Sequence, residues 1–345
     1  MSCKFSDNMK IGFFIKPLKR YLKMSKQVIL QGDNMSTISQ KMSVNYDELL
    51  AMISGTPHTD EECIAAFVAE MNRYASLFGM TNTNFVNSSG MNADGHYSCA
   101  KDLAKMVMCC TAYDKLMMYW GQESYSVEIG GSNARTITGV STYKGADMET
   151  LGDYYHIFGG KSGTWIISSS NHIENLILVC KSKVDDAWLA GCIMYNTYNP
   201  TAGVHSNRGV PFKEMLDWLE DYRVDPSTPA QAIQAQYCSA FVVPPHNPIA
   251  YQDVDLEMVG KSSTTQAKPA SCTKLMTAMV ALDHLSLDET ITIKSSDIKS
   301  GSGNTFYDGD TINSGDAILA MLLPSSNTLA TTLARVVGEK ILNGK

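Results

Sequence analysis

The chain lacks the patterns that mark several common functional classes. No apolar run in its 345 residues approaches the length needed to span a bilayer. With 28 basic and 35 acidic residues the formal net charge is −7, and no basic stripe with interleaved aromatics is present. The seven histidines form no H-E-x-x-H motif, and the nine cysteines have no metal-ligand spacing. We therefore expect no transmembrane segment, no nucleic-acid partner, no metal and no cofactor.

An export signal is also missing where one would look for it. Residues 1–27 place Lys and Arg around the apolar run Ile11–Ile15, which is too short for a signal-peptide core and has no small-residue cleavage site after it. A polar run from Gln31 to Ser43 follows. We expect residues 1–45 to form a poorly defined N-terminal arm.

What is present is the composition of a globular protein. Hydrophobic residues make up 44% of the chain and charged residues 18%, which is enough for one large core or two modest ones. The adjacent Cys109 and Cys110 fall on the apolar face of an expected helix, so we interpret them as core residues.

The strongest chemical signal lies between Lys268 and Thr277. Apolar residues after Ser271 recur at helical spacing, so this serine is expected where a buried helix begins. Lys274 follows three residues later on the same face, and its amine can therefore reach the serine oxygen. A lysine among apolar side chains can have a lowered pKa and act as the base for such a nucleophile. Alone, however, Ser-x-x-Lys also fits an ordinary helix.

Two further motifs change that interpretation. Ser325 and Asn327 fall in the corner between two apolar helices, where a helix N-cap would explain either residue equally well. Lys161-Ser162-Gly163 precedes a β-rich stretch and, read alone, is a glycine turn leading into an edge strand. Together the three motifs match the S-x-x-K, S-x-N and K-[ST]-G triplet of penicillin-recognising enzymes.

Longer segments extend the similarity over about four-fifths of the chain. The chain resembles the serine-type D-alanyl-D-alanine carboxypeptidases, the low-molecular-mass penicillin-binding proteins, in Phe67–Asn72, Leu77–Asn87, Gly95–Ser98 and Asp102–Ala104. The resemblance implies an α/β fold of the α+β type, penicillin-binding protein and β-lactamase-like. Helices flank an antiparallel sheet beside a mostly helical lobe, and the site lies in the groove between them.

The order of the segments differs from that of the family, in which K-T-G comes last. One interpretation is a circular permutation: residues 46–223 supply the usual C-terminal half, 224–236 a linker, and 237–345 the usual N-terminal half. The other is a window from tandem copies, which the echo of Asp316–Met321 in Asp47–Met52 supports.

The resemblance implies an acyl-enzyme mechanism. Ser271 attacks the carbonyl of the terminal D-Ala-D-Ala bond, with Lys274 as the base. Backbone N–H groups of Ser271 and Thr164 hold the developing oxyanion. Ser325 relays a proton to the leaving amine, and Asn327 holds the substrate amide and the lysine.

The resemblance also implies the partners. The substrate-binding residues Lys161, Ser162, Gly163 and Thr164 come from the third motif, with the first two on the free carboxylate of a peptidoglycan stem peptide. β-Lactams acylate Ser271 and act as inhibitors, and the family's location is extracytoplasmic. The run Thr164–Ser170 is unlike the commonest family version, which leaves the substrate preference open.

Three alternatives fit the same residues. A β-lactamase shares the triplet but needs fast deacylation, usually with a further carboxylate. A non-catalytic peptidoglycan-binding or penicillin-binding module would keep the groove without turnover. An incomplete fragment would lack a cooperative unfolding transition.

Periodicity and capping residues predict individual elements. Thr59 and Glu62 form a capping box for the first of the expected helices. The expected helices are 46–52, 63–78, 100–110 and 212–222, and the expected strands are 124–129, 134–138, 237–243 and 289–293.

Overall fold

The computed structural model describes residues 57–142, 151–198, 208–244, 249 and 255–344. The predicted arm 1–45 and the predicted helix 46–52 lie outside the described residues. Within the described ranges, no helix is both long enough and apolar enough to cross a bilayer.

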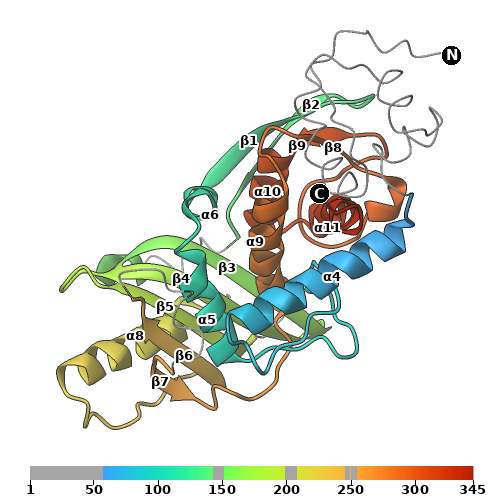
Figure 1. The fold of residues 1–345 in the computed structure, drawn as a ribbon. Helices are drawn as coiled ribbons and strands as arrows, with labels where there is room; N and C mark the ends of the chain where they lie inside the picture. Colours follow the sequence, from blue (N-terminus) through green and yellow to red (C-terminus); the bar gives the residue numbers. More distant parts are fainter. Residues whose placement is uncertain (1–56, 143–150, 199–207, 245–248, 250–254, 345) are drawn as a thin grey trace, which may run out of the picture.

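A five-stranded antiparallel sheet forms one side of the molecule (Figure 1). β4 reads as a continuous apolar run from Leu176 to Cys180 because both faces of the sheet are covered. The strands, in spatial order, are β3 (Tyr155–Ser168), β4 (Asn171–Ser182), β5 (Trp188–Tyr198), β6 (Tyr237–Val242) and β7 (Glu257–Lys261). Because β6 pairs with β5, residues from both expected halves of the chain complete one sheet.

Helices cover the two faces of this sheet. Ile177 and Val179 of β4 belong to the core shared with α5 (Ala100–Cys110). Leu176 and Leu178, which alternate with them, belong to the core under α8 (Gly209–Val224). The expected fold class, an antiparallel sheet with helices on both faces, is confirmed.

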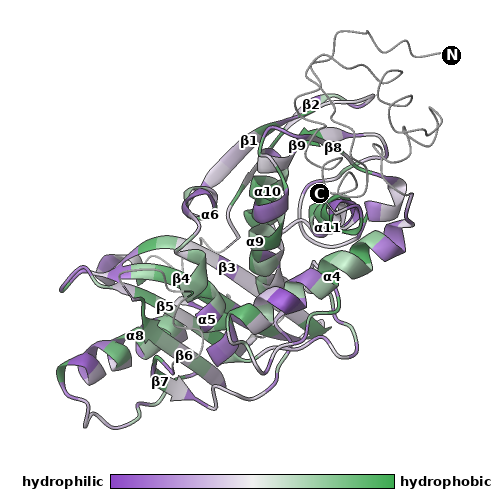
Figure 2. Ribbon diagram, viewed as in Figure 1, coloured by the Kyte–Doolittle hydropathy of each residue, from purple (hydrophilic) through white to green (hydrophobic). Residues whose placement is uncertain are grey.

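The remaining elements form a mostly helical lobe beside the sheet (Figure 1). Figure 2 shows hydrophobic residues along α9 and α10, two helices in which most residues are buried. The lobe contains α4 (Asp60–Leu77), α6 (Asp114–Trp120), α9 (Lys274–His284), α10 (Ser314–Leu322), α11 (Asn327–Leu342), the hairpin β1 (Ser124–Ile129) with β2 (Arg135–Val140), the short pair β8 (Thr290–Thr292) with β9 (Thr311–Asn313), and the 3₁₀ turn η6 (Ser295–Asp297).

The helices and strands that were predicted with bounds inside the described residues begin and end within three residues of those bounds. At the start of α4, Glu62 N–H donates to Thr59 Oγ1 over 3.2 Å, and Thr59 N–H donates to the Glu62 carboxylate over 2.8 Å. The capping box is therefore confirmed. The adjacent Cys109 and Cys110 are buried, as expected for core residues.

The glycines before Lys161 do not make the turn that this motif, read alone, suggested: residues 155–168 form one edge strand, with a bulge between Ile157 and Gly159. Ser271 lies where a buried helix begins, as expected. The helix starts as the 3₁₀ turn η5 (Ala270–Thr273), which runs directly into α9, so Lys274 is the first α-helical residue.

Candidate active site

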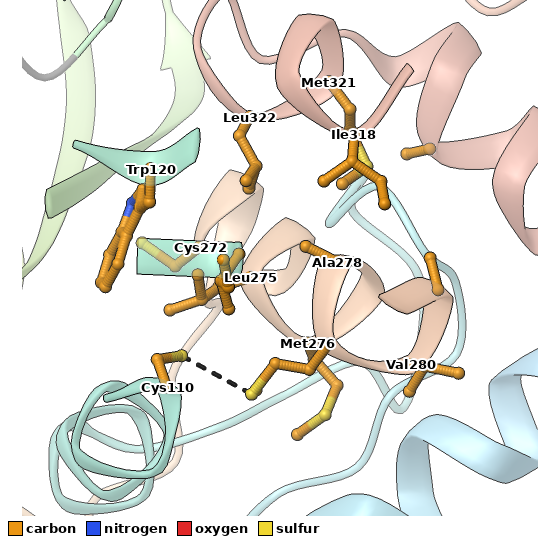
Figure 3. Close-up of a cluster of buried hydrophobic side chains, with 14 of the residues drawn as sticks. Cys110, Trp120, Cys272, Leu275, Met276, Ala278, Val280, Ile318, Met321 and Leu322 are labelled. Carbon is orange, nitrogen blue, oxygen red and sulfur yellow. Dashed lines mark hydrogen bonds between the residues drawn. The ribbon is translucent and has the colours of Figure 1, made fainter. Parts of the chain in front are cut away.

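The core of the lobe fixes the helix that carries Lys274. Leu275, Met276 and Ala278 are fully buried, and Figure 3 shows them among side chains from α6 and α10. The sulfur atoms of Cys110, in α5, and Met279, in α9, are 3.6 Å apart. Burying such side chains contributes about 1.5–3 kcal/mol each, so α9 is held on several sides at once.

Ser271 and Lys274 are in hydrogen-bond contact. Lys274 Nζ lies 2.9 Å from Ser271 Oγ, and donates to the Ser89 carbonyl over 2.7 Å and to Asn327 Oδ1 over 2.8 Å. Burial places the pKa of Lys274 well below its usual value, and the charge of Lys161 lowers it further. In its neutral form the amine has two N–H bonds for the two carbonyl oxygens and a lone pair that is then available to Ser271.

Asn327 orients this amine because its own side chain is fixed at both ends. Its Nδ2 donates to the Ser300 carbonyl over 2.9 Å, which turns the amide oxygen toward Lys274. Asn327 begins α11, and Ser326 is the N-cap that accepts from the Leu329 N–H. The cap explains Ser326, whereas Asn327 contacts the lysine.

The segment before Gly90 belongs to the site although sequence analysis did not assign it there. Ser89 supplies the carbonyl for Lys274, and Gly90 has φ +82°. A Cβ at Gly90 would lie 1.9 Å from the Ala270 carbonyl oxygen, so only glycine permits this approach to the serine turn. Ala270, immediately before Ser271, has φ +49°, which is unusual for a non-glycine residue.

Asn175 of β4 attaches the serine turn to the sheet. Its buried Nδ2 donates to the carbonyls of Lys268, over 2.8 Å, and Pro269, over 3.2 Å. Its Oδ1 accepts from the Tyr195 N–H over 3.0 Å. A β-rich sequence gave no signal for this role, because the contact joins residues more than ninety positions apart.

The third motif, Lys161-Ser162-Gly163, lies on the edge strand β3. Lys161 is buried, its Nζ donates to the Ser162 carbonyl over 2.9 Å, and burial lowers its pKa to about 8. Ser162 Oγ donates to Thr142 Oγ1 over 3.1 Å. A Cβ at Gly163 would lie 2.9 Å from the Pro269 carbonyl oxygen, so this glycine lets the strand pack against the serine turn.

Cys272 fills the space between the two walls as a neutral thiol. Its Sγ lies 3.6 Å from the Lys161 carbonyl oxygen, and burial raises its pKa to about 12. The thiolate is the nucleophilic form of cysteine, so Cys272 does not compete with Ser271.

A cavity of about 250 Å³ opens beside Ser271. Ser271, Asn327 and Thr164 line it, whereas Lys161, Ser162, Gly163 and Ser325 do not. The full lining is Ser89, Gly90, Met91, Asn92, His96, Thr164, Trp165, Ile166, Lys268, Ala270, Ser271, Gly301, Ser302 and Asn327.

Ser325 is buried with φ +68°, and its Oγ has no hydrogen-bond partner in the described part of the chain. The structure therefore does not join it to Lys274 or Ser271. An unsatisfied buried hydroxyl is costly, by about 1–3 kcal/mol, and its retention needs a reason.

His96 supports the serine turn from the other side. Its Nδ1 accepts from the Val86 N–H over 3.0 Å, so its proton is on Nε2, which donates to Thr273 Oγ1 over 3.0 Å. Burial lowers the pKa of His96 to about 4, and it is neutral near pH 7. His96 thus supports both its own loop, at Val86, and Thr273, the residue that precedes Lys274.

An antiparallel sheet beside a helical lobe, with a serine next to a buried lysine and facing a K-S-G edge strand, is the arrangement of the penicillin-binding protein and β-lactamase-like serine hydrolases. Sequence comparisons agree. Residues 62–156 match the D-alanyl-D-alanine carboxypeptidase family, and residues 248–344 match the β-lactamase enzyme family. The resemblance to the serine D-alanyl-D-alanine carboxypeptidases is confirmed.

Individual relatives match over short segments. The D-alanyl-D-alanine carboxypeptidase DacF of Bacillus subtilis is 35% identical over 75 residues, which are 22% of this chain and 18% of that protein. DacA of Escherichia coli, also a D-alanyl-D-alanine carboxypeptidase, is 31% identical over 86 residues, covering 22% of this chain and 21% of DacA. The chain thus spans about a fifth of these relatives. No solved structure matches significantly.

Proposed function

We propose that this chain is a serine D-Ala-D-Ala carboxypeptidase, which removes the terminal D-Ala from peptidoglycan stem peptides through an acyl-enzyme. One observation carries the proposal: the buried Lys274 amine lies 2.9 Å from Ser271 Oγ, while two carbonyl oxygens take its N–H groups. This arrangement suits a base that accepts the serine proton.

In the acylation step the Ser271 proton passes to Lys274 as Oγ bonds to the penultimate residue's carbonyl carbon. Backbone N–H groups of Ser271 and Thr164, both of which line the cavity, stabilise the oxyanion. When the tetrahedral intermediate collapses, the C–N bond breaks and the leaving amine takes a proton. The buried, unpartnered hydroxyl of Ser325 is our candidate for the relay of that proton.

Lys161 and Ser162 are assigned to the substrate's free carboxylate, and Asn327 to the substrate amide. Neither Lys161 nor Ser162 lines the cavity, so carboxylate binding requires their side chains to turn toward it. Among the residues that the structure describes, the Lys161 amine makes one hydrogen bond, to a carbonyl oxygen, which an anionic carboxylate can replace. A site for a free C-terminus explains removal of the last residue rather than internal cleavage.

Water then attacks the ester carbonyl carbon and gives a proton to Lys274. The bond between that carbon and Ser271 Oγ breaks, Oγ takes the proton from Lys274, and the shortened peptide leaves with a new carboxyl group. In β-lactams a strained amide and a carboxylate are placed like the scissile amide and the terminal carboxylate of the peptide. β-Lactams would therefore acylate Ser271 in the same way. Because peptidoglycan lies outside the cytoplasmic membrane, we assign the activity to that compartment.

β-Lactam hydrolysis is a second candidate, because residues 248–344 match the β-lactamase enzyme family. Rapid deacylation needs a group that activates water. No Asp or Glu is found among the residues that line the described cavity, which favours the carboxypeptidase. Nitrocefin turnover separates the two: a slow rate supports the carboxypeptidase, and a fast rate the β-lactamase.

We also propose that the segment order is a circular permutation. The two halves share one sheet, and α11 of one half packs on α4 of the other. A permuted enzyme would be active as a monomer of 37.7 kDa, whereas two copies that exchange halves would be active only as a dimer. Size-exclusion chromatography of penicillin-labelled protein distinguishes these outcomes.

The proposed activity is tested by intact-protein mass spectrometry after incubation with a fluorescent penicillin. We expect one adduct on the wild-type chain and none on Ser271→Ala, with proteolytic mapping to exclude Cys272. Ser170→Ala, in the exposed turn after β3, is the control and should retain the adduct. Release of D-Ala from diacetyl-Lys-D-Ala-D-Ala is then measured. A folded wild-type chain without an adduct, or an adduct that survives in Ser271→Ala, would overturn the proposal.

A further inference from the structure

One wall of the cavity beside Ser271 has a charge that the proposed mechanism does not use. Lys268 lines this cavity together with Met91, Trp165 and Ile166, and no acidic residue is among the described lining residues. The other ionisable lining group, His96, is neutral near pH 7. The cavity therefore combines an apolar rim with a positive charge.

Lys268 is held more firmly than an ordinary surface lysine. Its N–H donates to Tyr195 Oη over 3.2 Å, and its carbonyl accepts from the buried Asn175 Nδ2. Its Nζ donates to the Ala93 carbonyl over 3.1 Å. An ammonium has three N–H donors, and in the described chain no carboxylate lies within ion-pair distance of this one. Donors and charge are thus available to a ligand.

The neighbouring strand shows where a peptide would lie. β3 is at the edge of the sheet, so one side of its backbone pairs with no strand in the described chain. Thr164, Trp165 and Ile166 of this strand line the cavity. A peptide acylating Ser271 could extend along this edge, and the residue before its D-Ala-D-Ala end would reach the wall that contains Lys268.

We infer that Lys268 forms a carboxylate subsite, which selects stem peptides with a free carboxylate next to the D-Ala-D-Ala end. A diamino acid with its own carboxyl group satisfies this requirement, whereas lysine presents an ammonium that Lys268 repels. The inference rests on the proposed function and adds the substrate class to it. A carboxylate could come from that residue's side chain or from the preceding γ-linked glutamate.

The test compares acetyl-X-D-Ala-D-Ala peptides in which X is lysine or meso-diaminopimelate, a pair that differs by one carboxylate. We expect kcat/KM to be about tenfold higher for diaminopimelate, the effect of one net hydrogen bond to a charged group. Lys268→Met should abolish this preference, Lys268→Arg should keep it and Lys268→Glu should reverse it. A second pair of peptides is extended by γ-D-glutamate, whose α-carboxylate is free in one and amidated in the other. A preference for the free form would identify this glutamate as the source of the carboxylate.

Lys105→Met is the matched control, because Lys105 Nζ also donates to a backbone carbonyl, that of Gly79, and does not line the cavity. It should keep the wild-type preference. Equal use of both members of both pairs, or a preference that survives in Lys268→Met, overturns the subsite and leaves the carboxypeptidase proposal intact. If no peptide releases D-Ala and Ser271 takes no penicillin, the proposed function is wrong and the subsite falls with it.

Discussion

The two walls of the site each contain a buried lysine, and the two lysines are held differently. Lys274, on the helical wall, contacts oxygens from the serine turn, the Ser89 segment and α11. Lys161, on the strand wall, donates to the carbonyl of its own neighbour Ser162. Both pKa values are lowered by burial, but that of Lys161 falls only to about 8.

In the proposed function this difference suits two kinds of chemistry in one cleft. The proposed base must be neutral and aimed at its proton: burial favours the neutral form of Lys274, and its fixed oxygen partners orient it. A group that binds an anion must keep its charge and be free to exchange its partner, which a single carbonyl contact within the described chain would permit for Lys161. The nearby positive charge of Lys161 also favours the neutral form of Lys274.

The largest effect should follow from Lys274→Met, which preserves an unbranched, buried side chain. Loss of the base should lower the rate of acylation by a penicillin by roughly 10²–10⁴-fold. Stopped-flow fluorescence with a labelled penicillin measures the rate. Lys161→Met is the comparison, and we expect it to raise KM for a peptide with a free C-terminus more than it lowers kcat. Equal losses in both variants would remove the distinction between the walls.

The support behind the helical wall can be tested through His96. The pKa of His96 is about 4 in the folded chain, compared with an ordinary value near 6.5. Between these two pH values the unfolded chain therefore binds more protons than the folded chain. The free energy of unfolding should therefore rise with pH across this window, by at most roughly 3 kcal/mol, and should be lost again as pH falls toward 4. Urea unfolding at several pH values measures it.

His96→Gln keeps an acceptor and a donor but does not titrate, so the difference between wild type and variant should depend on pH. His156→Gln, at an exposed position of β3, serves as the control. A difference that is constant from pH 4 to 7 would contradict the assigned pKa.

The link between the walls should respond to Asn175→Ala. Without its Nδ2 contacts the serine turn loses its attachment to the sheet, and kcat should fall by roughly 10- to 100-fold, with less change in KM. Asn175→Asp keeps the acceptor for the Tyr195 N–H but lacks the donors, and should resemble the alanine variant. Asn171→Ala, at the start of the same strand, should have wild-type kinetics. Full activity in Asn175→Asp would show that the donors are dispensable.

The smallest effect is expected in the pH profile for carboxylate binding. Below about pH 8 Lys161 is charged and binds the substrate carboxylate; above it the charge is lost, and KM should rise by up to about tenfold. On the acid side, protonation of Lys274 should lower the acylation rate. Lys161→Arg should remove the alkaline change, because a guanidinium stays charged. Steady-state kinetics from pH 5 to 10 would show both the acid and the alkaline change. If the alkaline change persists in Lys161→Arg, a group other than Lys161 causes it.

Sequence patterns located the site well where its geometry is local. Ser271 and Lys274 are three residues apart, so any helical turn brings them together, and the 3₁₀ start changes this little. Apolar periodicity predicted the helices, and alternation predicted the strands. The glycines before Lys161 were misread, because a bulged strand and a turn share the same residue preferences.

The sequence by itself determined the contact between Ser271 and Lys274, the capped helix α4 and the strand that contains the K-S-G motif, since each depends on neighbours within a turn or a strand. The tertiary structure decided what surrounds them: the Ser89 carbonyl on Lys274, the Asn175 amide under the serine turn, His96 behind Thr273, and Lys268 on the cavity wall. These contacts join segments tens to nearly two hundred residues apart. Packing and burial create these contacts, and burial also lowers the pKa values of the two lysines. No local sequence pattern therefore predicts either the contacts or the pKa values.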